Sequence, residues 1–298
     1  LAMTECPKKM LVIGAGAIGM EFACFFRSFG AEVTVVELQD QVLPVEDAEI
    51  AKALEKSFLK QGVELRTKTG VESIERRGAT VSALLKSGDK VEQWSGDYCL
   101  VAVGVQGNVE DIGLEKIGIH PERSYIKVDK YYRTNVPGVY AIGDIIGPPW
   151  LAHVASHEGI IAAETIAGVA THPMDYDNIP GCTYCQPQVA SVGLTEKRAI
   201  DEGHKIKIGR FPFSASGKAV AIGETEGFVK VVIDAELEEI LGVHIIHSEA
   251  TELIGEATLA RSHEGVASTV LQTIHSHPTL SEAVMEAMGD ALGRAVHI

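Results

Sequence analysis

A glycine-rich turn near the start of the chain limits the possible folds more than any other feature. Residues 14–19 read Gly-Ala-Gly-Ala-Ile-Gly, after a short apolar run at 9–13 and before a segment, 18–29, whose pattern predicts a helix. A short apolar run that ends in glycine is typical of a buried parallel strand. Strand, glycine turn and helix in this order predict the first unit of a dinucleotide-binding fold.

Each glycine of this turn would serve a different purpose. Gly14 permits the tight turn, Gly16 lets a pyrophosphate approach the backbone, and Gly19 allows the helix to pack closely on the strand. Ala17 and Ile18 lie at the N-terminus of the helix, where free N–H groups favour phosphate. A bare glycine turn is the alternative, and the surrounding strand, helix and acidic residue favour the dinucleotide site.

The acidic residue is Glu37, which ends the next predicted strand, 32–37, and lies 18 positions after Gly19. A carboxylate at this place accepts hydrogen bonds from the hydroxyls of the adenosine ribose. Leu38 and Gln39 follow it, and no arginine lies nearby to meet a 2′-phosphate. We therefore expect the cofactor to be NAD(H) rather than NADP(H).

Alternating strand and helix patterns continue through the first hundred residues. Asp47 is expected to cap a helix that runs to about Lys60, and a strand is expected at 63–66. This order predicts a doubly wound parallel sheet of the α/β class. Residues 71–95 then predict an antiparallel meander, and 98–103 predict one more strand.

The pattern of predicted strands and helices changes near residues 105 and 175, where we expect domain boundaries. The middle part has little periodicity apart from a short strand at 139–142 and a helix at 154–167. The last part predicts an α+β arrangement with a mainly antiparallel sheet. Its strand-like runs cover 205–213, 227–233 and 240–246, and its helical patterns cover 195–202, 248–262 and 279–288.

Composition and charge exclude several classes of protein. Apolar residues make up 46% of the chain and charged residues 22%, which is ordinary for a globular protein with a sizeable core. Acidic residues number 41 against 26 lysines and arginines, a net charge of −15 that disfavours binding to nucleic acid or to an anionic membrane. No apolar run reaches the ~18–20 residues of a membrane-spanning helix.

Five cysteines are scattered along the chain, and their odd number and wide spacing do not indicate a secreted disulfide framework. Cys182 and Cys185 form a Cys-x-x-Cys pair. A redox dithiol would need a strand–helix context, and a zinc site would need a second pair of ligands. Neither is found in the sequence, so we expect plain structural thiols and no metal site.

A second motif lies at 134–144, which reads Thr-Asn-Val-Pro-Gly-Val-Tyr-Ala-Ile-Gly-Asp. Gly143 lets a ligand come close to the backbone. Asp144, at the carboxyl end of the predicted strand, can accept hydrogen bonds from ligand hydroxyls. A plain Gly-Asp turn is the alternative interpretation.

A third motif lies at 275–282, which reads His-Ser-His-Pro-Thr-Leu-Ser-Glu. A histidine held by a carboxylate is suited to removing a proton from a thiol near neutral pH, so His277 and Glu282 are candidates for an acid–base pair. Thr279 and Glu282 also have the spacing of a capping box that would open the helix at 279–288. We expect His275 to be structural.

The three motifs, in this order, resemble those of the pyridine nucleotide–disulfide oxidoreductases, and the third resembles the segment found in the dihydrolipoamide-oxidising members. The resemblance implies that Asp144 binds the ribityl chain of FAD and that residues 150–153 lie along the flavin. It adds Val71 and Gly104 to the NAD site, although Val105 and Gln106 replace the arginine segment that usually follows this glycine. The residues implied for FAD are Gly143, Asp144, Leu151, Ala152 and His153.

The same resemblance implies a complete architecture and reaction. It implies a Rossmann-like NAD-binding domain at 1–105, the C-terminal part of an FAD-binding domain at 106–175, and an interface domain for dimerisation at 176–298. The implied reaction is oxidation of dihydrolipoamide to lipoamide, with FAD as the flavin and NAD⁺ as the acceptor. His277 would be the acid–base and Glu282 would orient it.

The implied partners are a second copy of the chain and dihydrolipoamide on a carrier domain of a 2-oxo-acid dehydrogenase complex. The implied location is the bacterial cytoplasm, or the mitochondrial matrix in a eukaryote. Another flavin disulfide reductase, such as glutathione reductase, and an inactive NAD-binding fragment are the alternatives.

Two features of that family are absent from this sequence: its own N-terminal Gly-x-Gly-x-x-Gly for FAD, and the redox pair Cys-x4-Cys that follows it. We therefore expect the chain to be a fragment of a longer enzyme. We also expect it to have no lipoamide activity by itself.

Overall fold

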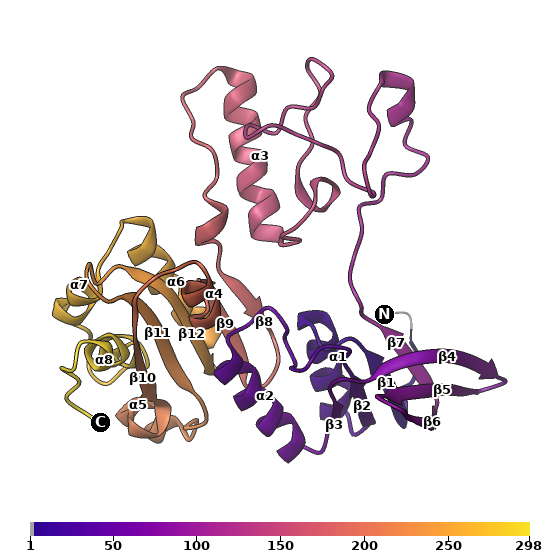
Figure 1. Cartoon of the computed structure of the whole chain (residues 1–298), viewed down its shortest axis with the longest axis horizontal. Helices are drawn as coiled ribbons and strands as arrows, with labels where there is room; N and C mark the ends of the chain where they lie inside the picture. Colours follow the sequence, from indigo (N-terminus) through magenta and orange to yellow (C-terminus); the bar gives the residue numbers. More distant parts are fainter. Residues whose placement is uncertain (1–2) are drawn as a thin grey trace. The chain divides into compact units, whose positions relative to one another are not determined.

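The computed structural model describes residues 3–298, which separate into two compact units. One unit combines the chain up to Val103 with Pro180–Ile298, and the other is Gly104–Ile179 (Figure 1). These limits lie close to the boundaries expected near 105 and 175. Because the first unit holds both the expected NAD-binding and interface segments, the division into three domains stays a prediction.

A four-stranded parallel sheet in the order β3-β2-β1-β7 forms the N-terminal part of the first unit. Helices pack on one face of it, and the buried side chains of Val12, Leu54 and Phe58 belong to that core. The strands read as apolar runs because both faces of the sheet are covered. The elements are β1 (Lys9–Ile13), α1 (Ala17–Ser28), β2 (Glu32–Val36), α2 (Ala48–Lys60), β3 (Glu64–Arg66) and β7 (Tyr98–Val101).

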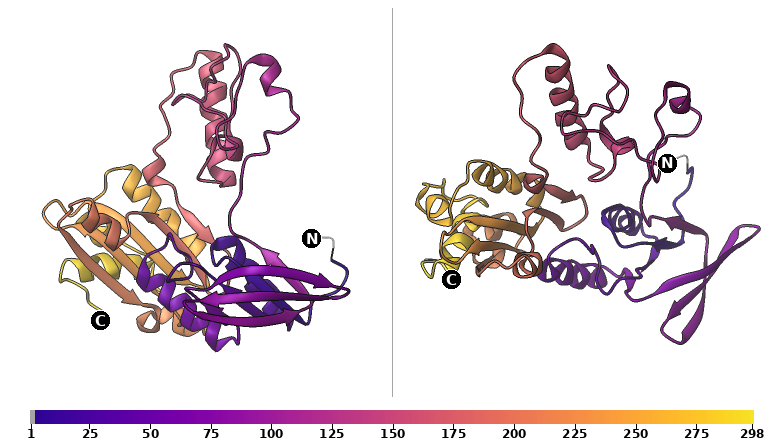
Figure 2. Two further views of the ribbon diagram at one scale, coloured as in Figure 1. Left: turned by 45° about the vertical axis from the view of Figure 1, so that its right-hand side comes forward. Right: turned by 45° about the horizontal axis from the view of Figure 1, so that its top comes forward.

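The expected meander is present and covers the other face of this sheet. It consists of β4 (Gly70–Arg77), β5 (Thr80–Ser87) and β6 (Lys90–Gly96), all antiparallel. Trp94 is buried in a cluster with Leu11, and its indole N–H donates to the hydroxyl of Thr34 at 3.2 Å. In Figure 2 the three strands form a ribbon that extends beyond the parallel sheet.

The C-terminal part of the first unit is a five-stranded antiparallel sheet in the order β10-β11-β12-β9-β8, as an α+β arrangement predicts. Two short helices, α5 (Gly217–Ile222) and α7 (Ala267–Gln272), were not expected from the sequence. Its strands are β8 (Gly181–Thr183), β9 (Gln188–Gly193), β10 (Ile206–Pro212), β11 (Phe228–Asp234) and β12 (Ile240–His247). Its helices are α4 (Glu196–Asp201), η4 (Phe213–Ala215), α5 (Gly217–Ile222), α6 (Ala250–Ser262), α7 (Ala267–Gln272) and α8 (Glu282–Ala291).

The second unit contains η1 (Leu114–Ile117), η2 (Gly143–Ile146), α3 (Ala152–Ala167) and η3 (Tyr176–Asn178). The prediction of a strand at 139–142 was wrong. Within the described residues, Tyr140 forms only an isolated bridge with Arg133, and an extended segment without consecutive pairing is not a strand. No helix within residues 3–298 is long and apolar enough to cross a membrane.

Candidate functional site

The glycine turn between β1 and α1 has the geometry that its sequence predicts. Gly14 has φ +99°, and a Cβ there would collide with the carbonyl oxygen of Ala102. A Cβ on Gly19 would collide with the carbonyl oxygen of Gly14, so this glycine lets α1 lie against the turn. A Cβ on Gly16 would meet nothing within 4 Å. The turn is therefore closed on the protein side and open at Gly16, where a ligand could approach.

The N-terminus of α1 is accessible and has no side-chain cap. Gly16 is the N-cap residue, and no side chain within residues 3–298 caps the first turn. Ala17 and Ile18, both exposed, follow it. Free N–H groups and the positive end of the helix dipole together make a binding site for an anion such as a pyrophosphate.

Glu37 lies beside this turn, as expected, and two backbone groups hold its carboxylate. Oε2 accepts a hydrogen bond from the N–H of Ala15 at 2.7 Å, and Oε1 accepts one from the N–H of Gln39 at 2.8 Å. Each carboxylate oxygen keeps a second lone pair for a ribose hydroxyl. The fixed negative charge would repel a 2′-phosphate at the same place.

The other two residues expected to contact NAD are Val71 and Gly104. Val71, on β4, is half-buried and packs against the cluster around Trp94. Gly104 is the first residue of the second unit and has φ +139°. Their contacts with a nicotinamide cofactor stay predictions.

The residues expected to hold FAD gather where η2 meets the start of α3. Gly143 begins η2 with φ +74°, and a Cβ there would lie 3.3 Å from the Cβ of Ala155 on α3. Asp144, in the first turn of η2, is exposed. Leu151 is the N-cap residue of α3, and Ala152 with His153 begins that helix. The structure thus brings these residues to one end of α3.

Glu158 on α3 supports this group and was missed by the sequence analysis. It is 2% exposed, and its carboxylate accepts hydrogen bonds from the N–H of Gly143 at 2.6 Å and from the hydroxyl of Tyr176 at 2.7 Å. Burial, together with neighbouring Tyr132 and Glu158, raises the pKa of the Tyr176 phenol, which therefore stays a donor. The available signal was its position on the buried face of α3, four residues after Val154 and three before Ile161.

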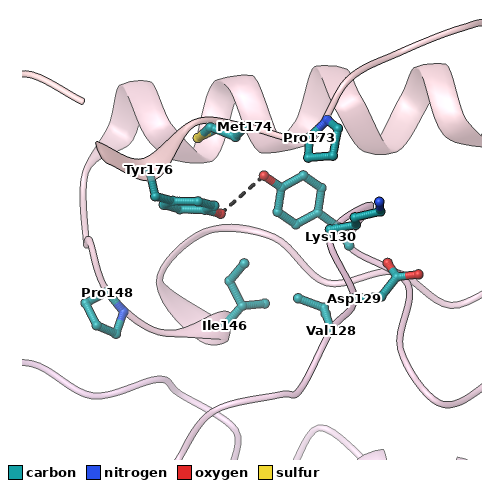
Figure 3. Close-up of a pocket in the computed structure, with 9 residues that line it drawn as sticks. Val128, Asp129, Lys130, Ile146, Pro148, Pro173, Met174 and Tyr176 are labelled. Carbon is teal, nitrogen blue, oxygen red and sulfur yellow. Dashed lines mark hydrogen bonds between the residues drawn. The ribbon is translucent and has the colours of Figure 1, made fainter. Parts of the chain in front are cut away.

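A cavity of about 330 Å³ lies beside these phenols. The hydroxyl oxygens of Tyr132 and Tyr176 lie 3.2 Å apart. Figure 3 shows Tyr176 among the residues that line the cavity. The cavity lies wholly within the second unit. Its lining residues are Val128, Asp129, Lys130, Tyr132, Ile146, Pro148, Pro173, Met174 and Tyr176.

The structure brings His277 and Glu282 together at the N-terminus of α8. Nδ1 of His277 lies 2.9 Å from Oε1 of Glu282, and Oε2 of Glu282 accepts a hydrogen bond from the N–H of Thr279 at 2.7 Å. The imidazole is 78% exposed. A hydrogen bond from Nδ1 to a carboxylate places the proton of the neutral ring on Nδ1. Nε2 is then left with a lone pair that faces outward as a base.

The charge state of Glu282 follows from its partners. Burial alone would raise the pKa of this carboxyl, but the hydrogen bonds from Thr279 and His277 and the charge of His277 hold it below its usual value. Glu282 is therefore ionised at neutral pH. A carboxylate in this position orients the imidazole and stabilises its protonated form.

The expected capping box at the start of α8 is only half formed. Glu282 accepts from the N–H of Thr279, but the Thr279 hydroxyl donates to the carbonyl of Ser276 at 2.7 Å. The helix accordingly begins at Glu282 instead of residue 279, which corrects the expected start.

His275 is placed differently from His277. Its side chain is 6% exposed, with Nε2 2.6 Å from Oε1 of Glu256 on α6 and Nδ1 2.9 Å from the carbonyl oxygen of Thr273. Both ring nitrogens are thus engaged within the protein. This supports a structural role, in which His275 ties the loop before His277 to α6.

The cysteines of the chain are free thiols. Burial raises the pKa of both Cys182 and Cys185, and the Cys185 Sγ donates to the carbonyl of Pro187 at 3.1 Å. A thiol with a raised pKa is a poor nucleophile and a poor metal ligand. Within residues 3–298 no group of three or more side chains could hold a metal ion. The raised pKa values support the structural interpretation of the pair.

Comparison with known protein families identifies two matching regions. Residues 1–159 match the family described as pyridine nucleotide-disulphide oxidoreductase. Residues 179–288 match the dimerisation domain of the same family.

Two relatives are named dihydrolipoyl dehydrogenase. The one from Zymomonas mobilis is 50% identical over 98% of this chain and 63% of its own length. The one from Rhizobium etli is 47% identical over 98% of this chain and 61% of its own length. The chain therefore spans less than two thirds of the length of these curated relatives.

Solved structures give the same fold. A crystal structure of LpdA from Mycobacterium tuberculosis has a TM-score of 0.88 and 30% identity, covering 96% of this chain and 62% of that one. The HOCl-induced flavoprotein disulfide reductase RclA from Escherichia coli has a TM-score of 0.89 and 27% identity, covering 97% of this chain and 66% of that one.

Proposed function

Since this chain belongs to the pyridine nucleotide-disulphide oxidoreductase family, we propose that it acts in the flavin-dependent oxidation of dihydrolipoamide to lipoamide, with NAD⁺ as acceptor. The observation that carries this proposal is the pair His277–Glu282, with Nδ1 and Oε1 2.9 Å apart and the far side of the imidazole exposed. Relatives at 47–50% identity that are named dihydrolipoyl dehydrogenase support it.

The proposed reaction requires a base. Two thiols of dihydrolipoamide lose two protons and two electrons as one S–S bond forms; NAD⁺ gains a hydride, and one proton is released. A thiolate is the reactive form of a thiol, so a group must first remove the S–H proton. Nε2 of His277 accepts that proton, and Glu282 stabilises the imidazolium that results.

The glycine turn fits NAD. The N–H groups at Gly16, Ala17 and Ile18 would face the pyrophosphate, since no side chain caps this end of α1. Glu37 would accept from the adenosine ribose, and its carboxylate, already fixed by Ala15, disfavours a 2′-phosphate. This favours NAD over NADP and argues against a glutathione reductase, which uses NADPH.

FAD, when bound, would carry the electron pair between the thiols and the nicotinamide. In this chain Asp144 would hold the ribityl hydroxyls, because its carboxylate is exposed at the start of η2. Gly143, Leu151, Ala152 and His153 would line the same region. The N–H of Gly143 is already engaged by Glu158, so Gly143 would contribute space and not a hydrogen bond.

We further propose that the protein works as a homodimer and takes its dithiol from a lipoyl group on a carrier domain of a 2-oxo-acid dehydrogenase complex. The match to a dimerisation domain supports the dimer. The strongly exposed His277 supports a substrate or partner that approaches from outside this chain.

The proposal is tested with the complete gene product that contains this chain. We expect NAD⁺-dependent oxidation of dihydrolipoamide, followed by NADH absorbance, and no reduction of glutathione disulfide by NADPH. The 298-residue chain alone should not turn over dihydrolipoamide, because both thiols of its Cys-x-x-Cys pair, Cys182 and Cys185, have raised pKa values and lie far from His277 in the sequence. Efficient NADPH-dependent reduction of glutathione disulfide would contradict the proposal.

A further inference from the structure

A row of polar side chains crosses the five-stranded antiparallel sheet of the first unit. Arg210 on β10 lies opposite Lys230 on β11, Lys230 lies opposite His244 on β12, and His244 lies opposite Ser191 on β9. Residues directly opposite each other on paired strands share one face of the sheet. These four residues, here called the polar row, therefore point to the same side.

An acidic segment from the N-terminal part, Glu46–Glu49, meets this row. Lys230 is 1% exposed, and its Nζ lies 2.9 Å from Oδ1 of Asp47 and 2.6 Å from Oε1 of Glu49. Arg210 pairs with Glu49 at 2.6 Å. At the other end of the row, the hydroxyl of Ser191 donates to Oε1 of Glu46 at 3.0 Å.

The contact is too polar to be explained by stability alone. Removing Lys230 and Asp47 from water costs free energy that their attraction only partly returns, and apolar side chains of similar volume would hold the two parts at least as well. Glu196, from α4, adds a third carboxylate at 2.6 Å from the same Nζ. A buried charge cluster can instead fix a single defined position for the groups that it joins.

The segment that the row fixes supports the glycine turn. Asp47 is the N-cap of α2 and accepts from the N–H of Glu49 at 3.0 Å. Just before it, the N–H of Glu46 donates to the carbonyl of Leu43 at 2.9 Å, and the N–H of Leu43 donates to the carbonyl of Ala15 at 2.8 Å. Ala15 lies between the first two glycines of the turn, so a short hydrogen-bonded path joins the polar row to the nucleotide site.

We propose that Lys230 is a positioning residue for dinucleotide binding. By holding Asp47 and Glu49 it fixes the loop that contains Leu43, and this loop in turn supports the backbone of Ala15. The proposal rests on the NAD site proposed above, and it makes the dimerisation part of the chain a determinant of NAD affinity. Lys230 itself touches no ligand.

The test compares Lys230→Met with Lys230→Arg in the complete gene product. We expect the methionine variant to bind NAD⁺ about tenfold more weakly in calorimetric titrations well below the unfolding temperature. The reason is that a smaller fraction of the molecules would hold the loop that contains Leu43 in the conformation that binds NAD⁺. The arginine variant, which keeps the charge, should recover most of the affinity. Lys205→Met is the matched control, since Lys205 pairs with Glu236 at the exposed surface of the same sheet and should leave the Kd unchanged.

A second measurement separates positioning from loss of stability. Amide exchange of the segment that includes Leu43 should speed up in Lys230→Met, while exchange in the distant meander β4–β6 should not change. Ser191→Ala, which removes only the hydrogen bond to Glu46, should fold if Lys230→Met does not. It should raise the Kd for NAD⁺ about threefold, as expected for one modest hydrogen bond.

The possible results are distinct. A folded Lys230→Met with wild-type Kd and wild-type exchange at Leu43 overturns the positioning role and leaves the proposed function intact. If Lys230→Met does not fold, an unchanged Kd in Ser191→Ala overturns it. Absence of NAD⁺ binding by the wild-type protein would instead contradict the proposed function, while the exchange measurement would still decide whether Lys230 orders the loop.

Discussion

Replacing Glu46 with glutamine should stabilise the protein above neutral pH and have little effect in acid. The carboxyl group is buried between Asp47 and the hydroxyl of Ser191, and its Oε2 has no hydrogen-bond partner among the described residues. Burial, with the nearby charge of Asp47, raises the pKa of Glu46 from 4.5 to about 7. Glutamine resembles the protonated acid in shape and charge, so Glu46→Gln removes the cost of ionisation.

The size of this stabilisation follows from the shift in the pKa of Glu46. A raised pKa means that the folded state binds the proton more tightly than the unfolded state, so the stability that depends on Glu46 falls as pH rises from 4.5 to 7. The difference of about 2.5 units corresponds to about 3 kcal/mol at 1.36 kcal/mol per unit. Below pH 4.5 the carboxyl is protonated in both states and the cost disappears.

The assay is urea unfolding of wild type and Glu46→Gln at pH 4.5 and pH 8, followed by tryptophan fluorescence, to which buried Trp94 contributes. We expect the two proteins to be nearly equal at the lower pH. At pH 8 the variant should be more stable by about 3 kcal/mol. Glu226→Gln, at an exposed position, controls for the loss of one negative charge. The reasoning would be refuted if the difference in free energy of unfolding between wild type and Glu46→Gln were the same at both pH values. A variant less stable than wild type at pH 8 would also refute it.

Two further predictions concern the glycine turn. Gly19→Ala places a Cβ against the carbonyl of Gly14. It should therefore lower the free energy of unfolding by about 1–3 kcal/mol in urea titrations and weaken NAD⁺ binding. Wild-type affinity for NAD⁺ would show that binding does not require α1 to lie so close to the glycine turn. Glu37→Ala removes the ribose acceptor and the charge that opposes a 2′-phosphate. The Kd for NAD⁺ should therefore rise about tenfold while that for NADP⁺ does not, and an unchanged preference in calorimetric titrations would count against the role of Glu37.

Local patterns were the part of the structure that the sequence predicted best. The glycine turn, the cap at Asp47 and the meander depend on residues close together in the chain, and all three are present. The pairing of His277 with Glu282 is also local, because His277 lies in the loop just before α8 and Glu282 is the first residue of that helix. Short-range geometry limits such features enough for the sequence alone to suffice.

Long-range pairing explains what the sequence did not predict. Lys230 is an isolated lysine in the apolar strand β11, and its partners Asp47 and Glu49 lie more than 180 positions away. Only the strand register places it in a row with His244 and Ser191. The start of α8 was misplaced for a local reason, because the hydroxyl of Thr279 had an alternative acceptor in the preceding loop.

The central claim is that the imidazole of His277, oriented by Glu282, removes the proton from a thiol of the substrate. The most direct measurement is the pH profile of NAD⁺-dependent dihydrolipoamide oxidation by the complete gene product, for wild type and His277→Gln. The variant should lose at least about a hundredfold in kcat, as expected when a general base is removed, while its Kd for NAD⁺ stays at the wild-type value. Wild-type turnover in His277→Gln, with an unchanged pH profile, would contradict the claim.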